Sequence, residues 1–185
     1  MRSSKSLASA ICLVACFIAG CGALAEQRPG SLAIRGAKLG GAADAPVLEL
    51  ALDCRLSGPM QDALDNGIPL TFRIAVDSGG WFGNGAHSEH RIELRYFPLS
   101  RRYQLRELDA AVEARSFATP GSLLAGLNSL RLPLPATFRT LPQNTPLSIG
   151  AGLEAAALPG ALRLPALFEP AWRLSAAEYT WQPAG

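Results

Sequence analysis

Along two stretches of this 185-residue chain every second side chain is apolar, and a period of two is the pattern of a β-strand with one buried face. The residues between them are mostly charged, polar or small, so each strand would turn its other face to solvent. Cys54 falls within an apolar series, which predicts a small buried side chain rather than a reactive thiol. The two apolar series are Leu48, Leu50, Leu52, Cys54 and Leu56, and then Ile68, Leu70, Phe72, Ile74 and Val76.

A β-hairpin with a basic outer face is predicted after these strands. Ile92 and Leu94 lie in one alternating run, Tyr103 and Leu105 lie in the next, and Pro98 begins the turn between them. Guanidinium groups match phosphate and carboxylate oxygens, so this face would bind lipid headgroups or an acidic partner. The alternative is a solvated face whose charges are balanced by nearby carboxylates. The arginines are Arg91, Arg95, Arg102 and Arg106, and their acidic partners would be Glu93, Glu107 and Asp109.

Two short helices and further strands complete the pattern. Pro59 and Pro120 each suit the first turn of a helix, and Thr119 is a suitable N-cap for the second helix. Additional strands are predicted at residues 112–117, 147–153 and 172–181. About seven strands, with no regular alternation of strand and helix, predict a mainly β fold. We expect an antiparallel, two-layer sandwich-like domain with one or two short helices.

The N-terminal segment has the pattern of a secretory signal peptide. Arg2 and Lys5 precede an uncharged, largely apolar stretch that ends in small residues. Two cleavage sites remain open: cleavage after Ala25, or cleavage before Cys21, where the preceding residues resemble a bacterial lipobox and the cysteine would be acylated. Either cleavage predicts export to the periplasm, and acylation of Cys21 would tether the protein to a membrane.

Three parts of the chain follow from these patterns. The signal would cover residues 1–25, or residues 1–20 in a lipoprotein. Residues 26–45 are rich in Gly, Ala and polar side chains, and they would form a flexible leader that can add an edge strand. Residues 46–185 would form a single β-rich domain.

The mature chain would carry no formal net charge and no internal disulfide. The signal contains two of the 17 basic residues and none of the 15 acidic ones. A neutral domain lacks the basic footprint of a nucleic-acid-binding protein, so no nucleic-acid partner is expected. Cys54 would be the one unmodified cysteine left after processing, which leaves it without a partner for a disulfide.

Few residues offer catalytic chemistry. His87 and His90 flank Glu89 and could supply zinc ligands, but in a Gly-rich loop solvated side chains are the simpler interpretation. The sequence has no GxSxG motif, phosphate-binding loop, Cys-His pair or cysteine array, so we predict no enzyme, no metal and no cofactor. Trp81 and Phe82 lie in the same loop, where they would anchor a contact with a partner or fold back onto the domain.

Three passages resemble an uncharacterised proteobacterial family, DUF4390. They are residues 52–76, residues 91–108 and residues 168–181, and the most specific segments are Ala63 to Phe72 and Pro170 to Ser175. The resemblance implies an exported protein of the kind often described as a proline-rich signal-peptide protein. It also implies a gene that often lies near those of an rRNA methyltransferase and a sensor kinase. No catalytic residues are known for the family, so the resemblance assigns none here.

Together these observations predict a non-enzymatic exported envelope protein that serves as a protein-interaction or sensing accessory module. The partner would be another envelope protein, such as a sensor kinase, and contact with a membrane would come only through a lipid on Cys21. Trp81, Phe82 and the four hairpin arginines would form the binding surface. The alternative is a periplasmic carrier of a small ligand or lipid, whose core would be hollow.

Overall fold

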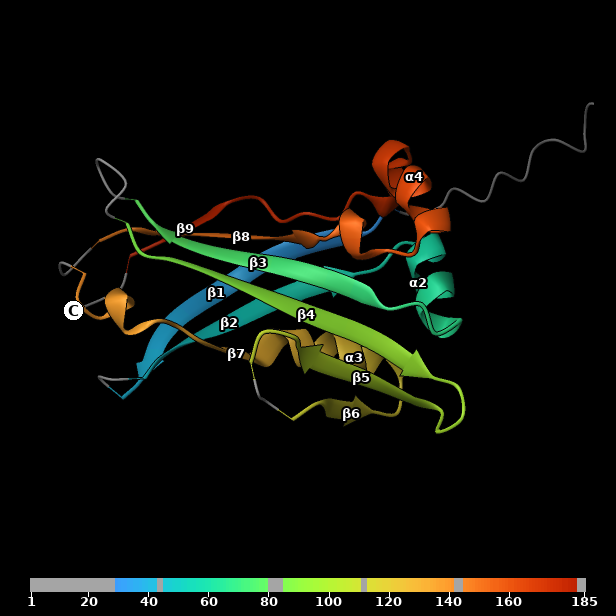
Figure 1. The fold of residues 1–185 in the computed structure, drawn as a ribbon, viewed down its shortest axis with the longest axis horizontal. Helices are drawn as coiled ribbons and strands as arrows, with labels where there is room; N and C mark the ends of the chain where they lie inside the picture. The colour runs from blue at the N-terminus through green and yellow to red at the C-terminus, as the bar shows by residue number, and fades with distance from the viewer. Residues whose placement is uncertain (1–28, 43–44, 80–84, 111–112, 142–144, 183–185) are drawn as a thin grey trace, which may run out of the picture.

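Two antiparallel β-sheets face each other in this protein and enclose one hydrophobic core. The computed structural model describes residues 29–42, 45–79, 85–110, 113–141 and 145–182. Within these ranges one sheet has six strands and the other has three (Figure 1). Apolar side chains from both sheets belong to a single buried cluster, which includes Leu50 and Leu132 from the small sheet and Phe72 and Ile74 from the large one. The predicted mainly β, antiparallel, two-layer architecture is confirmed.

The six-stranded sheet has the order β6-β5-β4-β3-β8-β9, and all of its pairs are antiparallel. Strands β3, β4 and β5 are neighbours in both sequence and space, whereas β8 joins β3 from a distant part of the chain. The alternating apolar residues predicted the strands β3, β4 and β5, which include the middle of this sheet. The strands are β3 (Leu70–Ser78), β4 (His87–Phe97), β5 (Arg102–Glu107), β6 (Arg115–Phe117), β8 (Leu147–Leu153) and β9 (Tyr179–Trp181).

The three-stranded sheet contains β1 (Ser31–Gly41), β2 (Pro46–Arg55) and β7 (Leu130–Pro133), in the order β1-β2-β7. Most of the segment predicted as a flexible leader is therefore an ordered edge strand. The edge strand that this segment was expected to add is present. Its full length was not predicted, because small residues interrupt the alternation and the pairing register shifts between Ile34 and Gly36. The strand ends at Gly41, whose φ of +83° and close approach to the Ala45 carbonyl require a residue without a Cβ.

Three short helices are present in the described ranges: α2 (Gly58–Asp65), α3 (Pro120–Ala125) and α4 (Gly160–Phe168). The first two have the predicted prolines in their first turn, and the Thr119 side chain caps α3 by accepting a hydrogen bond from the Ser122 amide. Helix α4 was not predicted because Pro165 lies inside it, and a proline removes one hydrogen bond from the helix. None of these helices is long and apolar enough to cross a membrane.

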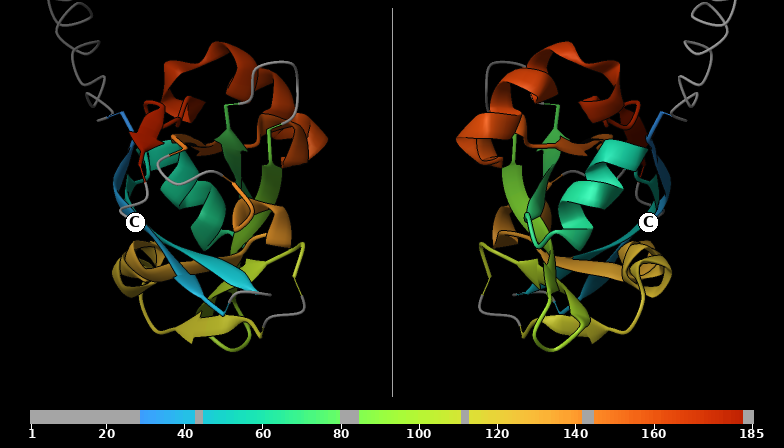
Figure 2. Two further views of the ribbon diagram at one scale, coloured as in Figure 1. Left: turned by 90° about the vertical axis from the view of Figure 1, so that its left-hand side faces the viewer. Right: turned by 90° about the vertical axis from the view of Figure 1, so that its right-hand side faces the viewer.

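One end of the sandwich is closed by helices. Met60, Ala63 and Leu64 of α2 are buried in the core, and α4 lies beside α2 at this end (Figures 1 and 2). The chain then passes through a short 3-10 helix, η6 (Pro170–Trp172), in which Trp172 is buried. The strand predicted at residues 172–181 is therefore limited to β9 and to one isolated bridge between Ser175 and Gly152.

Candidate functional site

The outer face of the six-stranded sheet carries the predicted arginines. Alternate residues of β4 face outward, among them Arg91, Glu93 and Arg95, and their exposure contrasts with the burial of Ile92 and Leu94 between them. The pairing register places the outward residues of β5 beside them. The structure thus brings the four hairpin arginines onto one surface, as the period of two predicted.

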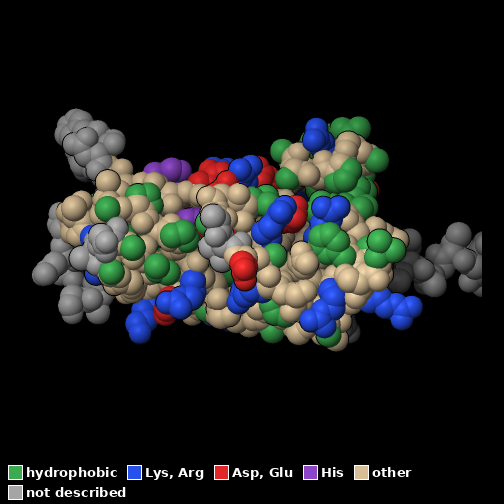
Figure 3. Space-filling view, turned by 60° about the horizontal axis from the view of Figure 1, so that its bottom comes forward, with side chains coloured by type: hydrophobic (Ala, Val, Ile, Leu, Met, Phe, Trp, Pro, Cys, Tyr) green, Lys and Arg blue, Asp and Glu red, His purple; other side chains and the backbone are tan. Residues whose placement is uncertain are grey.

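Ion pairs neutralise much of this surface. Arg91 binds the Asp109 carboxylate with Nε and a terminal nitrogen, the closest contact being 2.7 Å, and Arg106 contacts Glu93 at 3.2 Å. Hydrogen bonds from Arg91 lower the pKa of the Asp109 carboxyl below its ordinary value. Figure 3 shows basic and acidic side chains lying side by side on the surface. Glu93 and Asp109 are therefore partners of the arginines, as one of the two sequence interpretations expected.

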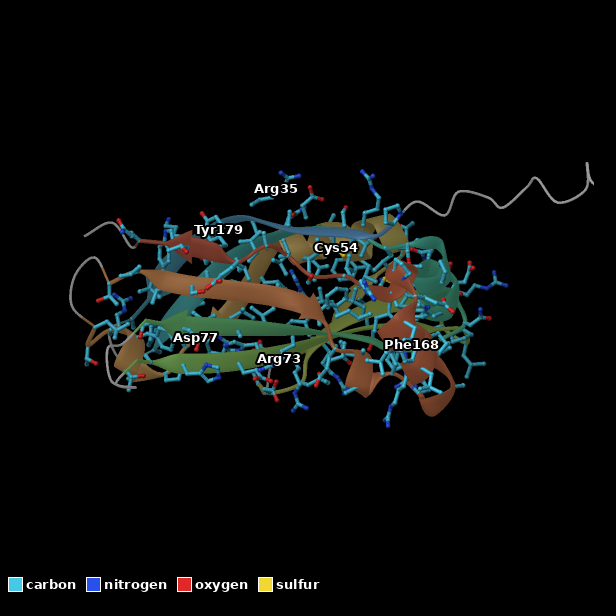
Figure 4. The ribbon with its side chains drawn as sticks, turned by 90° about the horizontal axis from the view of Figure 1, so that it is seen from above. Arg35, Cys54, Arg73, Asp77, Phe168 and Tyr179 are labelled. Carbon is cyan, nitrogen blue, oxygen red and sulfur yellow. The ribbon has the colours of Figure 1, made fainter. Side chains whose placement is uncertain are left out.

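One ion pair and one hydrogen bond connect this surface to β3. Arg73 contacts Glu89 at 2.8 Å, and His87 Nδ1 lies 2.5 Å from Asp77 Oδ1. Figure 4 shows Arg73 and Asp77 along the length of β3. On β8 the cross-strand partners of Arg73 and Ala75 are Gly152 and Gly150, so β8 contributes no side chain at these two positions.

The tip of the hairpin differs from the rest of this face. We define the hairpin patch as Arg95, Phe97, Arg102 and Gln104, which are two cross-strand pairs of β4 and β5. The Arg95 guanidinium lies 5.1 Å from the centroid of the Phe97 ring, within the range of a cation–π interaction. Neither Arg95 nor Arg102 forms an ion pair with any residue that the structure describes. The positive charge of the face is therefore concentrated at its tip.

Several other predicted residues are not brought to this surface. Trp81, Phe82 and Cys21 lie outside the described residues. His87 and His90 point to opposite faces of β4, because three residues along a strand reverse the direction of the side chain. The described ranges contain no group of three or more His, Cys, Asp or Glu side chains that could hold a metal ion.

A buried polar cluster on the inner face was missed by the sequence analysis. His90 Nδ1 lies 2.8 Å from Glu107 Oε1, and His90 Nε2 lies 3.0 Å from the Ser88 hydroxyl. All three residues are at most 8% exposed. Glu107 was assigned to the solvated face, and this was wrong, because it faces inward like Tyr103 and Leu105. The period of two extends the inward-facing series beyond its apolar residues. Two residues after Leu105 it reaches Glu107, and two and four residues before Ile92 it reaches His90 and Ser88.

The order of these groups, hydroxyl, imidazole and carboxylate, is that of a nucleophile activated by a base and an orienting acid. The surroundings do not suit that chemistry. Ser88 lies in the regular β3–β4 ladder opposite Val76, and its side chain faces a core of buried apolar residues. Ser88 is only 8% exposed, so its hydroxyl offers little surface to a substrate. The cluster is better explained as a satisfied polar network that fixes the packing of β4 and β5.

Depressions on the described surface are open rather than enclosed. One of about 470 Å³ lies over the small sheet beside Lys38, Glu49 and Arg131. A smaller one of about 170 Å³ lies between the sheets and is bordered by Glu107, Arg115 and Arg131. Cys54 is free and half-buried, and burial raises the pKa of its thiol to about 12, which keeps it protonated and unreactive at neutral pH.

Comparison with known proteins identifies a family but no function. No curated protein and no solved structure matches the chain. A family model matches residues 30–182, from the residue before β1 to the residue after β9. The matched range includes both sheets and the three helices, and the match agrees with the resemblance in the sequence. The chain therefore belongs to the family described as Domain of unknown function (DUF4390).

Proposed function

We propose that this protein is a non-enzymatic, exported envelope protein that acts by binding another protein through the hairpin patch. The observation that carries the proposal is the contrast on the outer face of the sheet. Arg91 and Arg106 are engaged by carboxylates, whereas Arg95 and Arg102 have no such partner among the described residues and flank Phe97. Arginine and aromatic side chains are enriched where protein interfaces derive their binding energy.

The patch is suited to an acidic protein surface. It lies on two paired strands, so its side chains are positioned before binding and little conformational entropy would be lost. Two guanidinium groups without carboxylate partners offer bidentate contacts to carboxylates of the partner. The predicted export would bring the protein to a partner in the envelope, where the periplasmic part of a sensor kinase is one example suggested by the family resemblance. The apolar interior argues against a hollow ligand carrier, because buried side chains from both sheets fill it.

Photo-crosslinking in cells tests this proposal. A crosslinking amino acid at Gln104, within the patch, should give a covalent adduct with an envelope protein. The same amino acid at Lys38, on the outer face of the small sheet, is the matched control and should give none. Charge reversal of Arg95 and Arg102 to Glu should abolish the adduct at position 104, whereas Arg106→Glu should reduce it by less than half.

Two outcomes would contradict the proposal. One is the absence of an adduct at position 104, or equal adducts from positions 104 and 38. The other is covalent labelling of Ser88 by a fluorophosphonate probe in the folded protein, because it would reveal an activated nucleophile and therefore an enzyme.

A further inference from the structure

Helix α4 presents an apolar surface that nothing in the described part of the chain covers. Leu164, Leu167 and Phe168 are 65%, 59% and 74% exposed, although the helix also contributes buried Ala166 to the core. Five large hydrophobic residues are exposed in the described ranges, and three of them lie on this one short helix. Figure 3 shows hydrophobic side chains gathered at the end of the molecule that carries α4. Such a concentration of exposed apolar side chains marks an interaction site.

The N-terminal segment enters the domain beside this helix. A Cβ placed on Gly30 would lie 3.1 Å from Leu174 Cδ1 and 3.2 Å from the Ser57 amide, and the Ser57 hydroxyl donates a 2.6 Å hydrogen bond to the Ala171 carbonyl. Residues 171–174 follow α4 directly in the chain. The start of β1 and helix α4 therefore share one end of the sandwich (Figures 1 and 4).

We propose that α4 docks this end of the protein on the surface of a phospholipid bilayer. The apolar export segment ends at Ala25, five residues before Gly30, and Cys21 lies nine residues before it. Even a fully extended chain spans only about 3.5 Å per residue, so a lipid on Cys21 would hold Gly30 within about 30 Å of the bilayer. At that distance α4 would meet the membrane at a high effective concentration.

The chemistry of the helix favours lipid over an acidic or basic protein surface. Residues 160–168 contain one charged side chain, Arg163, and no carboxylate. A short helix with leucine and phenylalanine on one face and a single arginine can bury its apolar side chains at the boundary between headgroups and acyl chains. Helix α2, which lies beside α4, carries two acidic residues, Asp62 and Asp65. Asp65 accepts hydrogen bonds from Tyr103 and Gln61.

This inference concerns a surface separate from the hairpin patch, so the two proposals can fail independently. The test measures binding of purified protein that begins at Glu26, the product of cleavage after Ala25, which carries no acyl chain. The vesicles contain phosphatidylethanolamine and phosphatidylglycerol. Replacement of Leu164, Leu167 and Phe168 by Gln should weaken binding by roughly 100-fold, because three large apolar side chains lose their burial in the membrane interface. The control Leu108→Gln removes an exposed leucine that directly follows β5, and it should change binding by less than about twofold.

Three results would overturn the inference, given a thermal unfolding curve that shows the triple variant to be folded. The first is equal vesicle binding by the triple variant and its parent. The second is a dimer in sedimentation velocity that the triple variant abolishes, which would make a second copy the occupant of α4. The third is an in-cell crosslink from position 167 to a protein rather than to lipid.

Discussion

Strand β4 carries polar side chains with close partners on both of its faces, and the two faces place them in opposite surroundings. On the outer face Arg91 and Asp109 are 46% and 31% exposed, whereas on the inner face His90 and Glu107 are 5% and 6% exposed. The contact distances are nearly the same, 2.7 Å and 2.8 Å. Water screens the interaction within the outer pair. The inner pair is shielded from water, so its polar atoms depend on each other for hydrogen bonds. The outer pair should therefore contribute little to stability, and the inner pair should contribute much more.

Removal of one partner of the inner pair should have the largest effect on stability. Glu107→Ala leaves His90 Nδ1 without its partner inside the core, and we expect a loss of about 3–5 kcal/mol in the free energy of unfolding. Urea denaturation measures this loss. The control is Glu89→Ala, a carboxylate on the outer face of β4. Equal losses for the two variants would show that burial does not distinguish the two faces.

Replacement of the whole inner cluster should be less harmful than removal of one member. The triple variant Ser88→Ala, His90→Leu and Glu107→Leu leaves no polar group without a partner, so it should be more stable than Glu107→Ala by about 2 kcal/mol or more. The same urea titration applies. A triple variant less stable than Glu107→Ala would show that the cluster contributes through its specific packing rather than through polar satisfaction.

An outer ion pair should contribute much less. Arg73 and Glu89 are 53% and 37% exposed, so the interaction energy from a double-mutant cycle with Arg73→Ala and Glu89→Gln should be at most about 0.5 kcal/mol. This energy should fall further in high salt, since solvent-exposed charges are screened. A coupling above about 1.5 kcal/mol that resists salt would contradict the comparison.

The smallest expected effect is a pH dependence from Asp109. Arg91 lowers the pKa of this carboxyl in the folded state, so the pair contributes stability above the unfolded pKa, near pH 4, and loses it as the pH falls through the folded pKa. Asp109→Asn should therefore reduce the fall in Tm between about pH 5 and pH 3 by about 1–2 °C. Thermal unfolding followed by circular dichroism measures it. A variant whose Tm falls more steeply than the parent's would reverse the predicted sign.

The sequence predicted the fold wherever side chains alternate strictly. The strands that contain Leu50, Phe72, Ile92 and Leu105 were found because each buries one face, and the direction of the side chains then followed from parity. Strand β1 was harder to predict, because glycine and alanine carry little apolar signal and its pairing contains a bulge. Helix α4 was not predicted because Pro165 lies inside it. Its leucines were not expected at the surface, because leucine in a sequence usually indicates a core position.

The sequence predicted which face of the sheet carries the candidate site, but it did not predict which of its arginines form ion pairs. Parity placed Arg95 and Arg102 on one face, but it could not show that Arg91 is engaged by Asp109 while Arg95 is not. Those pairings depend on where the chain goes after β5, which no local pattern specifies. Glu107 was misassigned because a carboxylate was expected to face solvent, although a buried histidine can hold it inside.

The strand order of the large sheet bears on the order in which the chain folds. Strands β3, β4 and β5 pair with their sequence neighbours, so short loop closures are enough to form them early. The other edge of β3 must wait for β8, which is encoded much later. Until then β3 presents an unpaired apolar strand edge of the kind that recruits chaperones or aggregates. A chain that ends before Leu147 would keep this vulnerability permanently.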